Sequence, residues 1–525
     1  YDISGISQLD YLELYKKYTY SKQESYRLDY IAEQELGDRK KENPGDTFRD
    51  FYTKHWQTFV DYNIHDVELV DKLEDKMRLI ELHLTMAYQA KINPEDVYSQ
   101  VRMWDAIIYN HLRKKGIVIP MKVNNGGKDA QFEGAYVKDP IIGFHNWVAS
   151  FDVNSEYPSV IMGSNISPET IVDPSDYDNN MRSIISSNVS VDALLAGRVD
   201  TSRLKDSNVC LTANGQFFRR DKQGFMPEMV EKMFADRKRY KKEMLDAEAA
   251  YENETDPKKK KELKNKIARF NNLQLSKKVS LNSLYGAMGS KYFRFFDLRQ
   301  AVAVTTTGQL SIRWVEKRIN AYINKVLKAN DDYVIAIDTD SVYLNLGELV
   351  YKTLLSDAKD TSKAINFMDR VCESKLQPVI DKACGELGDY TNVYQQKIVM
   401  KREVLADKAI WTAKKRYILN VHNSEGVQYA KPKKKVMGLE MIKSSTPTAC
   451  REKLREAIDV IFDADETAII SFIETFRSEF ENLPLADIAF PRGLNAIVKW
   501  TNAKTLYESG TPIHVRGAIL HNHLL

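Results

Sequence analysis

Two aspartates one residue apart lie between two apolar runs in the segment Tyr333–Leu346, which reads YVIAIDTDSVYLNL. Both runs are rich in residues that favour strands, so we expect a β-hairpin with Asp338, Thr339 and Asp340 at or beside its tip. Like charges on a rigid turn repel each other, and a divalent cation removes that cost; Mg²⁺ prefers oxygen ligands of this kind. Alone, the pattern also fits an ordinary aspartate-rich turn.

A third aspartate, Asp152, ends the strand-like run WVASFDV and is followed by VNSEYPSVI. If the strand at 147–151 and the hairpin share a sheet, Asp152 and the pair Asp338/Asp340 could converge on two metal ions. Two metals bridged by carboxylates serve in-line phosphoryl transfer, because one lowers the pKa of the attacking hydroxyl and the other holds the leaving oxygens.

A polar face is expected on the segment KVSLNSLYG, because Lys278, Asn282 and Tyr285 fall at positions i, i+4 and i+7 of a helix. Arg237 and Lys241 are spaced i, i+4 on a preceding helix. Together the two helices could present three cations to one polyphosphate. The alternative is that these are ordinary exposed helix charges.

A basic segment, KKRY at Lys414–Tyr417, is followed by KPKKK at 431–435 and by Lys443. Basic residues interleaved with an aromatic ring suit contact with a nucleic-acid backbone, although a basic edge strand explains them equally well.

Helices are expected to position these residues. The first 90 residues look mostly helical, with a loop near Asn43–Gly45, and Asn124–Gly127 marks a break. Pro227 opens a helix to about Tyr251, and Asp256–Pro257 starts a second, so the two form an antiparallel pair. The lysine run Lys258–Lys261 at its tip is expected to be a solvated helix end.

A third long helix is expected over Leu298–Leu327. Its apolar stripe is predicted to pack beneath the central hairpin; the stripe consists of Val315, Ile319, Tyr322, Ile323 and Val326. After Ala430 the composition turns basic, and helices are expected to fill most of the remainder.

The composition indicates several globular domains, since the chain has 525 residues of which 43% are hydrophobic. A net charge of +3 argues only weakly for an acidic partner. The four cysteines show no C-x-x-C spacing, so we expect free thiols in a reducing compartment and no metal cluster. Without a bilayer-spanning run or a signal peptide, the protein is expected to be soluble and intracellular. Position 1 is Tyr, so the start could be a cut or a processing site.

Taken together and in this order, the motifs resemble those of the family B DNA polymerases. DVNSEYPSVI resembles the first palm motif, KVSLNSLYG the fingers motif, IDTDS the second palm motif and KKRY the primer-grasping motif. The sequence around these motifs is similar to that of the replicative polymerases of T-even-type phages. The similar segments are NISPET (165–170), KVMGLE (435–440), KSSTP (443–447) and IHVRG (513–517).

The resemblance covers essentially the whole chain and implies a multidomain α/β (α+β) fold. This would be a right-hand polymerase with palm, fingers and partial thumb, preceded by a partial RNase H-like 3′–5′ exonuclease domain. The expected domains are 1–90 (end of the exonuclease), 91–125 (connecting segment or N-terminal-domain remnant), 126–223 (first part of the palm), 224–290 (fingers), 291–438 (second part of the palm) and 439–525 (partial thumb).

The resemblance also implies roles for single residues. Asp152 and Asp340 would be the main ligands of two Mg²⁺ ions, with the Val153 carbonyl, and Asp338 and Glu403 would be accessory acids. The nucleotide would be bound by Ser155, Tyr157, Arg237, Lys241, Lys278, Asn282 and Tyr285. DNA would be bound by Lys414, Lys415, Arg416, Tyr417, Lys435 and Lys443.

Within these sets the resemblance assigns finer tasks. Tyr157 would pack under the sugar and reject a 2′-hydroxyl, and Tyr285 would sense the minor groove. Asn282 would assist closure of the fingers, while Lys415 and Tyr417 would grip the primer end.

The segment YNIHD resembles the third motif of the family's exonuclease, with Tyr62 and the metal ligand Asp66. The first two motifs would lie upstream of this chain, and Asp66-Val67-Glu68 cannot serve as the first because it lies within the third. The proofreading site is therefore expected to be incomplete.

Three further departures from the family pattern stand out. Glu156 replaces the usual Leu and could be solvated or could disturb the base-pair fit. Ile337 replaces a Gly before Asp338 and is expected to stiffen the hairpin tip. The chain ends at Leu525, so the later thumb and the clamp-binding tail are expected to be absent.

The resemblance predicts a DNA-directed DNA polymerase, a nucleotidyltransferase that adds deoxynucleotides to a primer 3′-hydroxyl during phage DNA replication in the cytoplasm of the infected cell. Its partners would be primer–template DNA and dNTPs; a sliding clamp is a possible further partner, but its expected binding tail is absent from the sequence. The alternatives are a catalytically silent DNA-binding replisome subunit, or one half of a split polymerase whose partner polypeptide supplies the missing exonuclease motifs. Every palm acid and the fingers cations are present, which favours the enzyme.

Overall fold

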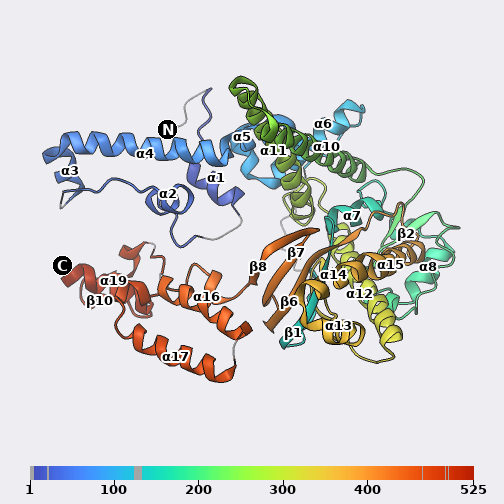
Figure 1. Cartoon of the computed structure of the whole chain (residues 1–525). Coiled ribbons are helices and arrows are strands. Elements are labelled where there is room, and N and C mark those ends of the chain that lie inside the picture. Colours follow the sequence, from blue (N-terminus) through green and yellow to red (C-terminus); the bar gives the residue numbers. More distant parts are fainter. Residues whose placement is uncertain are drawn as a thin grey trace. The chain divides into compact units, whose positions relative to one another are not determined.

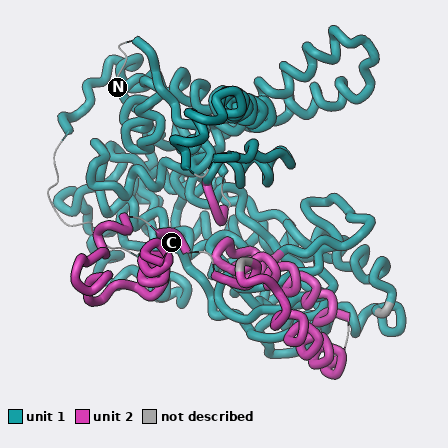
Figure 2. Tube along the Cα trace, turned by 90° about the vertical axis from the view of Figure 1, so that its left-hand side faces the viewer, with its two compact units in different colours: residues 1–20, 27–435 teal, residues 21–26, 436–525 magenta. Residues whose placement is uncertain are grey.

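The computed structural model of the protein describes residues 5–19, 23–45, 47–122, 133–463, 465–490, 492–494 and 496–524. The chain divides into two compact units, residues 1–20 with 27–435 and residues 21–26 with 436–525 (Figure 2). The segments predicted as exonuclease, palm and fingers all fall in the first unit, apart from residues 21–26 and the last three palm residues. The assignment of the individual domains stays a prediction.

A six-stranded sheet lies at the centre of the first unit (Figure 1). Its strand order is β4 (Val334–Asp338), β5 (Ser341–Asn345), β1 (Gly143–Val153), β6 (Met400–Ala413), β7 (Arg416–Ser424) and β8 (Val427–Met437). The pairs β4–β5, β5–β1, β1–β6 and β6–β7 are antiparallel. The predicted hairpin is confirmed, because Asp338 pairs with Ser341 across a two-residue turn.

Alternate residues of β1 enter different cores, as the two-residue period of a strand requires. Ala149, Phe151 and Val153 contribute to a core with α12 (Leu298–Leu327), α14 (Thr361–Val371) and α15 (Gln377–Tyr390). Val148 joins a separate cluster around the rings of Tyr343, Trp411 and Tyr417. The sheet that carries the acidic residues is therefore covered by apolar packing on both faces.

The helix α12 has the predicted bounds and packs beneath the hairpin. Val315, Ile319 and Ile323 are buried in the same core as Val334 and Val342 of the hairpin, and Tyr322 packs against it. The prediction is wrong for Val326, which is 50% exposed near the C-terminal end of the helix.

The predicted helix pair is α10 (Phe225–Asn253) and α11 (Pro257–Met288). The Asp256 side chain accepts a hydrogen bond from the Lys258 N–H at 2.8 Å, and Pro257 occupies the first helical position, which explains why α11 begins there. Helix α10 begins two residues before Pro227, because proline is tolerated within a first turn. Lys258 and Lys259 lie exposed at the tip, as predicted.

Helices also make up the N-terminal part, as predicted. They are α1 (Tyr11–Tyr18), α2 (Leu28–Leu36), α3 (Phe48–Lys54), α4 (Trp56–Met77), α5 (Leu79–Ala90) and α6 (Gln100–Lys114). Trp104 of α6 is buried and its Nε1–H donates to Ser283 Oγ of α11 at 3.0 Å, so α6 supports the helix pair. The predicted break at 124–127 lies outside the described residues.

The remaining elements of the first unit are short. They are α7 (Glu156–Gly163), α8 (Asn179–Ser186), α9 (Val191–Leu195), α13 (Gly347–Leu354), β2 (Val209–Leu211), β3 (Phe217–Arg219), the 3₁₀ turns at 94–98, 174–176 and 355–359, and a π turn at 372–376.

The second unit is mostly helical, as expected. It contains α16 (Thr448–Asp463), α17 (Glu466–Phe480), α18 (Leu485–Ile488), α19 (Ile513–Leu524), the strands β9 (Thr501–Asn502) and β10 (Leu506–Tyr507), and 3₁₀ turns at 440–442 and 497–500.

The cysteines and the lengths of the helices bear on two expectations from composition. All four cysteines are free, and burial raises the pKa of Cys210, Cys372 and Cys384 to about 12, so these three thiols stay protonated. Across the described residues, no helix combines the length and apolar character that crossing a membrane requires.

Candidate active site

The tip of the β4–β5 hairpin presents Asp340 on a tight turn. Thr339 has φ 61°, which is unfavourable for a β-branched residue and costs on the order of 1–3 kcal/mol. Its N–H donates to the Tyr136 carbonyl at 3.0 Å, and the Asp340 N–H donates to the Asp338 carbonyl at 2.8 Å. These hydrogen bonds hold the turn in its strained conformation and fix the backbone position from which the Asp340 side chain extends.

The strand β1 brings Asp152 beside this turn. Asp152 pairs with Ser341 across the β1–β5 ladder, and the Val153 N–H donates to the Asp340 carbonyl at 2.9 Å. Two aspartates that are far apart in the sequence therefore lie on neighbouring strands, as the shared-sheet hypothesis requires.

Burial and mutual repulsion disfavour negative charge at this pair. Burial, together with the charges of Asp340 and Glu403, raises the pKa of the Asp152 carboxyl to about 7. Burial also raises the pKa of Asp340, helped by Asp338 and Glu403. No ion pair within the described residues involves either carboxylate. The donor set therefore fits a hard divalent cation, whose charge would remove the repulsion. The described residues contain no preformed group of three or more His, Cys, Asp or Glu side chains arranged around a metal position.

The two predicted accessory acids are already paired with cations. Glu403 of β6 accepts from Lys435 Nζ at 2.7 Å and from Ser150 Oγ at 3.3 Å. Asp338 lies 3.1 Å from Lys415 Nζ. Both acids are thus partly neutralised by the protein itself, in contrast to Asp152 and Asp340.

One cavity joins the sheet to the helix pair. It has a volume of about 680 Å³, and Asp152, Arg237 and Lys241 all line it. Arg237 Nε is buried without a hydrogen-bond partner among the described residues, and burial lowers the pKa of its guanidinium. Arg237, which forms no ion pair among the described residues, therefore faces the same space as the partly buried Asp152. This cavity is large enough for a nucleotide-sized ligand.

Three predicted residues of α11 do not line this cavity. Lys278 and Asn282 lie on the helix face expected from their spacing, but neither reaches the 680 Å³ space. The Tyr285 ring lies 4.5 Å from the Tyr157 ring, at an interplanar angle of 49°. The two tyrosines therefore form an aromatic contact between α7 and α11.

The helix α7 starts abruptly after β1. Ser155 has φ 54°, which turns the chain from strand to helix within two residues of Val153. Glu156 follows and is only 5% exposed, so the alternative that it is solvated is wrong. Its Oε1 has no hydrogen-bond partner in the described part of the chain. Burial, together with the charges of Asp340 and Asp152, raises its pKa to about 8.

Lys414 and Lys415 lie in the turn between β6 and β7, and Lys415 has φ 60°. Lys414 Nζ is 3.0 Å from Asp139 Oδ1. Tyr417 is only 3% exposed; its ring stacks on Trp411 and its hydroxyl lies 2.8 Å from the Tyr343 hydroxyl. A direct contact of Tyr417 with a primer stays a prediction.

The lysines at 431–435 lie on β8, which is an edge strand of the sheet. Lys431, Lys433 and Lys434 are exposed, and Pro432 is compatible with an edge position because a proline cannot donate to a further strand. Lys443 belongs to the second unit and pairs with Glu440 at 3.1 Å. The basic edge strand exists, and a role in DNA binding is compatible with it.

The residues of the exonuclease-like motif lie one turn apart on α4. Lys40 Nζ is 2.6 Å from Asp66 Oδ2 and 4.5 Å from the centroid of the Tyr62 ring. Asp66 Oδ1 is buried without a hydrogen-bond partner among the described residues. A lysine thus neutralises the carboxylate that was predicted to bind a metal.

Sequence reasoning missed several residues that line the 680 Å³ cavity, including Lys401, Arg402 and Glu425. Lys401 and Arg402 precede Glu403 in the segment MKRE, which was the available signal. Arg402 pairs with Asp369 at 2.9 Å and donates to Asn423 at 2.7 Å.

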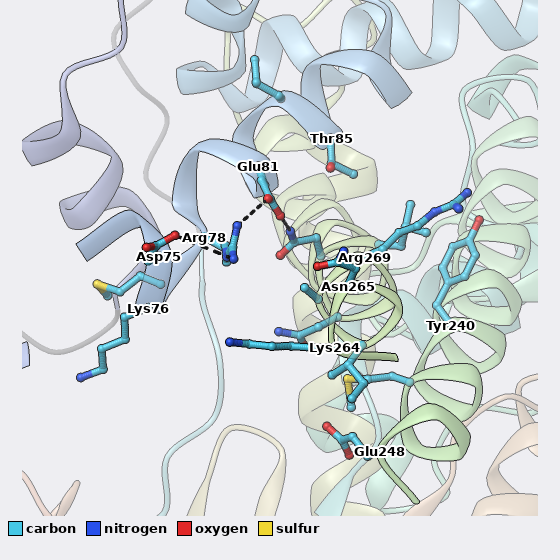
Figure 3. A pocket seen from close by; sticks show the side chains of 18 of the residues that line it. Asp75, Lys76, Arg78, Glu81, Thr85, Tyr240, Glu248, Lys264, Asn265 and Arg269 are labelled. Carbon is cyan, nitrogen blue, oxygen red and sulfur yellow. Dashed lines mark hydrogen bonds and ion pairs between the residues drawn. The ribbon is translucent and has the colours of Figure 1, made fainter. Parts of the chain in front are cut away.

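A larger cavity of about 1210 Å³ lies between α5 and the helices α10 and α11 (Figure 3). No predicted site residue lines it. Its charges are mixed and partly paired: Arg78 contacts Glu81 at 2.9 Å and Asp75 at 3.9 Å, and Glu81 also accepts from Asn272. The smaller cavity also mixes acids with cations; it is distinguished by Asp152 and by Arg237, whose Nε has no hydrogen-bond partner among the described residues.

The comparisons with known proteins all match DNA polymerases. The family model described as DNA polymerase family B matches residues 98–490. The DNA-directed DNA polymerases of Escherichia phage RB69 and Enterobacteria phage T4 are each 33% identical over 99% of this chain and 61% of their own length. The DNA polymerase delta catalytic subunit of Drosophila melanogaster is 26% identical over 62% of this chain and 27% of its own length. The chain thus spans about three-fifths of the length of the two phage relatives.

Proposed function

The chain belongs to the family B DNA polymerases, and from this premise we propose that it is a template-directed DNA polymerase module of phage DNA replication. The observation that carries the proposal is the single cavity lined by Asp152 of the sheet and by Arg237 and Lys241 of the helix pair. In this proposal the six-stranded sheet is the palm, α10 and α11 are the fingers, and residues 439–525 are part of the thumb.

Asp152, Asp340 and the Val153 carbonyl would hold two Mg²⁺ ions. When bound there, Mg²⁺ would activate the primer 3′-hydroxyl and neutralise charge on the phosphates. The bond that forms joins the primer 3′-oxygen to the α-phosphorus of the deoxynucleotide, and the bond that breaks releases pyrophosphate. The strained, hydrogen-bonded turn at Thr339 holds Asp340 in place before substrate binds, so less ordering is needed during the reaction.

The cations of the helix pair would bind the triphosphate. Arg237 is half-buried and its Nε has no hydrogen-bond partner among the described residues, and Lys241 is exposed at the same cavity, so a polyphosphate would supply an anionic partner for these two cations. Lys278 and Asn282 would reach the nucleotide after movement of α11 towards the sheet. Tyr157 would lie under the sugar, and its neighbour Tyr285 would lie against the nascent base pair.

Primer–template DNA would lie along the basic residues of the edge strand β8 and of the turn between β6 and β7. The exposed lysines of β8, with Lys414, Lys415 and Arg416, would contact backbone phosphates, so binding should weaken with salt. Lys443 of the second unit would be a separate phosphate contact. Tyr417 would support this surface from below through its contacts with Trp411 and Tyr343.

Primer extension with Mg²⁺ tests the proposed polymerase. The parent protein should extend a labelled primer, and Asp340→Asn should abolish extension while DNA binding is kept, because the substitution removes one of the two proposed metal ligands, Asp152 and Asp340. The matched variant Asp338→Asn changes an acid already paired with Lys415 and should reduce the rate less. Extension by Asp340→Asn at the parental rate would contradict the assignment. A parent that binds DNA without extending the primer would favour the silent replisome subunit.

We further propose that the α4 surface contacts the polypeptide that carries the remaining exonuclease motifs, whether in the same chain or in a separate one. Ile64 and Val67, one turn apart on α4, are 52% and 65% exposed, and Trp56 at the start of the same helix is 62% exposed, so α4 presents large apolar side chains to solvent. Gel filtration with a polypeptide carrying those motifs should show co-elution, and substitution of Ile64 and Val67 by Ser should weaken it. Separate elution under all conditions would count against this contact.

A further inference from the structure

A buried carboxyl group lies directly behind the proposed nucleotide site. Glu156 begins α7, four residues after Asp152, and its side chain packs on α12 at Gly308. A Cβ atom placed on Gly308 would lie 3.0 Å from Glu156 Oε1 and 3.1 Å from its Cδ. The absence of a side chain at Gly308 is therefore what allows the Glu156 carboxyl to occupy this position.

The contact explains a glycine that is otherwise costly. Gly308 lies inside a 30-residue helix, where glycine is less favourable than alanine by about 1 kcal/mol. Outside its own helix, the three atoms nearest to a Cβ at this position all belong to Glu156. Glu156 and Gly308 thus form a matched pair: the carboxyl group of the long Glu156 side chain occupies the space beside Gly308, which has no side chain.

This pair lies at the start of α7, where a small shift has a large effect. Ser155 has φ 54°, so the direction of the first helical turn is set by a sharp bend and by the side chains that pack after it. Tyr157 is the next residue, and its ring lies 4.5 Å from the Tyr285 ring. Because Tyr157 directly follows Glu156 in the chain, a displacement of Glu156 would also displace Tyr157.

We propose that Glu156, seated on Gly308, is a positioning residue that sets where Tyr157 lies against Tyr285 and thereby how strictly the site selects the sugar of the incoming nucleotide. The inference rests on the proposed polymerase function and on the position of Tyr157 under the sugar. Glu156 acts here through its length and shape, because its Oε1 makes no hydrogen bond with any described residue. A side chain of the same length without the acid should therefore serve equally well, and a shorter one should not.

Four variants test the matched pair. Glu156→Gln keeps the length and should keep the parental preference for deoxyribonucleotides over ribonucleotides. Glu156→Asp removes one methylene, and Gly308→Ala pushes the carboxyl away by a few tenths of an ångström. Each should reduce the preference by about 3- to 10-fold, since a 1 Å misplacement costs about 100-fold. The double variant Glu156→Asp/Gly308→Ala should recover part of it, because the added methyl fills the space left by the shorter acid.

The control is Gly385→Ala. Gly385 also lies inside a helix, α15, but a Cβ there meets no atom within 4 Å, so the preference should equal that of the parent. Single-nucleotide incorporation with dNTP and rNTP gives KM and kcat for each variant, and thermal melting establishes that each one folds. The loss of preference should appear mainly as a lower KM for rNTP, while a purely structural defect would lower kcat for both substrates.

The outcomes separate the inference from the function on which it rests. If Glu156→Asp and Gly308→Ala both left the preference unchanged in an active protein, the positioning role would be overturned and the polymerase function kept. If Glu156→Gln lost as much preference as Glu156→Asp, length alone would not explain the effect, and the inference would again be overturned. A parent without primer extension would overturn both proposals together.

Discussion

Arg237 offers the most direct measure of triphosphate binding, because it is half-buried at the 680 Å³ cavity and its Nε has no hydrogen-bond partner in the part of the chain that the structure describes. Substitution by Ala removes one charge-assisted hydrogen bond to the nucleotide. Hydrogen bonds to charged groups contribute about 1.5–3 kcal/mol, so KM for dNTP should rise about 10- to 150-fold at 1.4 kcal/mol per tenfold. Since the interaction would already exist in the bound substrate, kcat should change less than KM.

The matched control is Arg239→Ala on the same helix. Arg239 is exposed, pairs with Asp236 at 2.9 Å and does not line the cavity, so KM should stay within about twofold of the parental value. Primer extension at several dNTP concentrations measures both variants. A KM for Arg237→Ala within twofold of the parent would refute the reasoning, as would an equal rise in both variants, because the second result would indicate a general effect of charge on α10.

Three further predictions concern stability. Tyr343→Phe should destabilise the protein by about 1–3 kcal/mol in chemical unfolding, because it removes the Tyr343 partner of the buried Tyr417 hydroxyl. Tyr417→Phe should cost less, because the Tyr343 hydroxyl keeps its hydrogen bond with Ser341; a loss of DNA affinity in Tyr417→Phe alone would instead indicate a direct primer contact. The pKa of Glu156 is raised from 4.5 to about 8, so its ionisation destabilises the fold progressively as pH rises through that range. Glu156→Gln should therefore raise the melting temperature more at about pH 8.5 than at about pH 5.5, and an equal gain at both values would contradict the buried position. Lys40→Ala should lower the melting temperature by about 2–4 °C by leaving Asp66 without its cation, and Asp66→Asn in the same protein should recover part of the loss; no recovery would mean that Lys40 acts elsewhere.

Much of the fold follows from local sequence signals. The hairpin and α12 were predictable from the periods of their apolar residues, and α11 from the cap Asp256 followed by Pro257. These features depend on neighbours within a few residues, so the sequence contains them directly. Val326 was misjudged because periodicity identifies a helix face but not where the packing partner of that face ends.

The parts of the site that could not be predicted depend on contacts between distant segments. The burial of Glu156 requires Gly308 of α12, and the neutralisation of Asp66 requires Lys40 from the segment that follows α2. The position of Tyr417 beneath the basic surface depends on Trp411 and on Tyr343 of a distant strand. The family resemblance assigned roles to these positions, but it carried no information on which side chains surround them here.

The ladder between β1 and β5 has a consequence for how the chain acquires its site. Asp152 precedes α10, α11 and α12 in the sequence, and Asp340 follows them, so β1 must find its place between β5 and β6 after a long loop has closed. Such non-local pairing is slow compared with helix formation. The connection between α10 and α11, where Thr255 and Asp256 are exposed, offers a point at which the chain could be cut. One fragment would carry Asp152 with the cations of α10, and the other would carry Asp340 with Lys278. Neither fragment would contain both aspartates, so recovery of activity on mixing would report directly on the reassembly of the sheet.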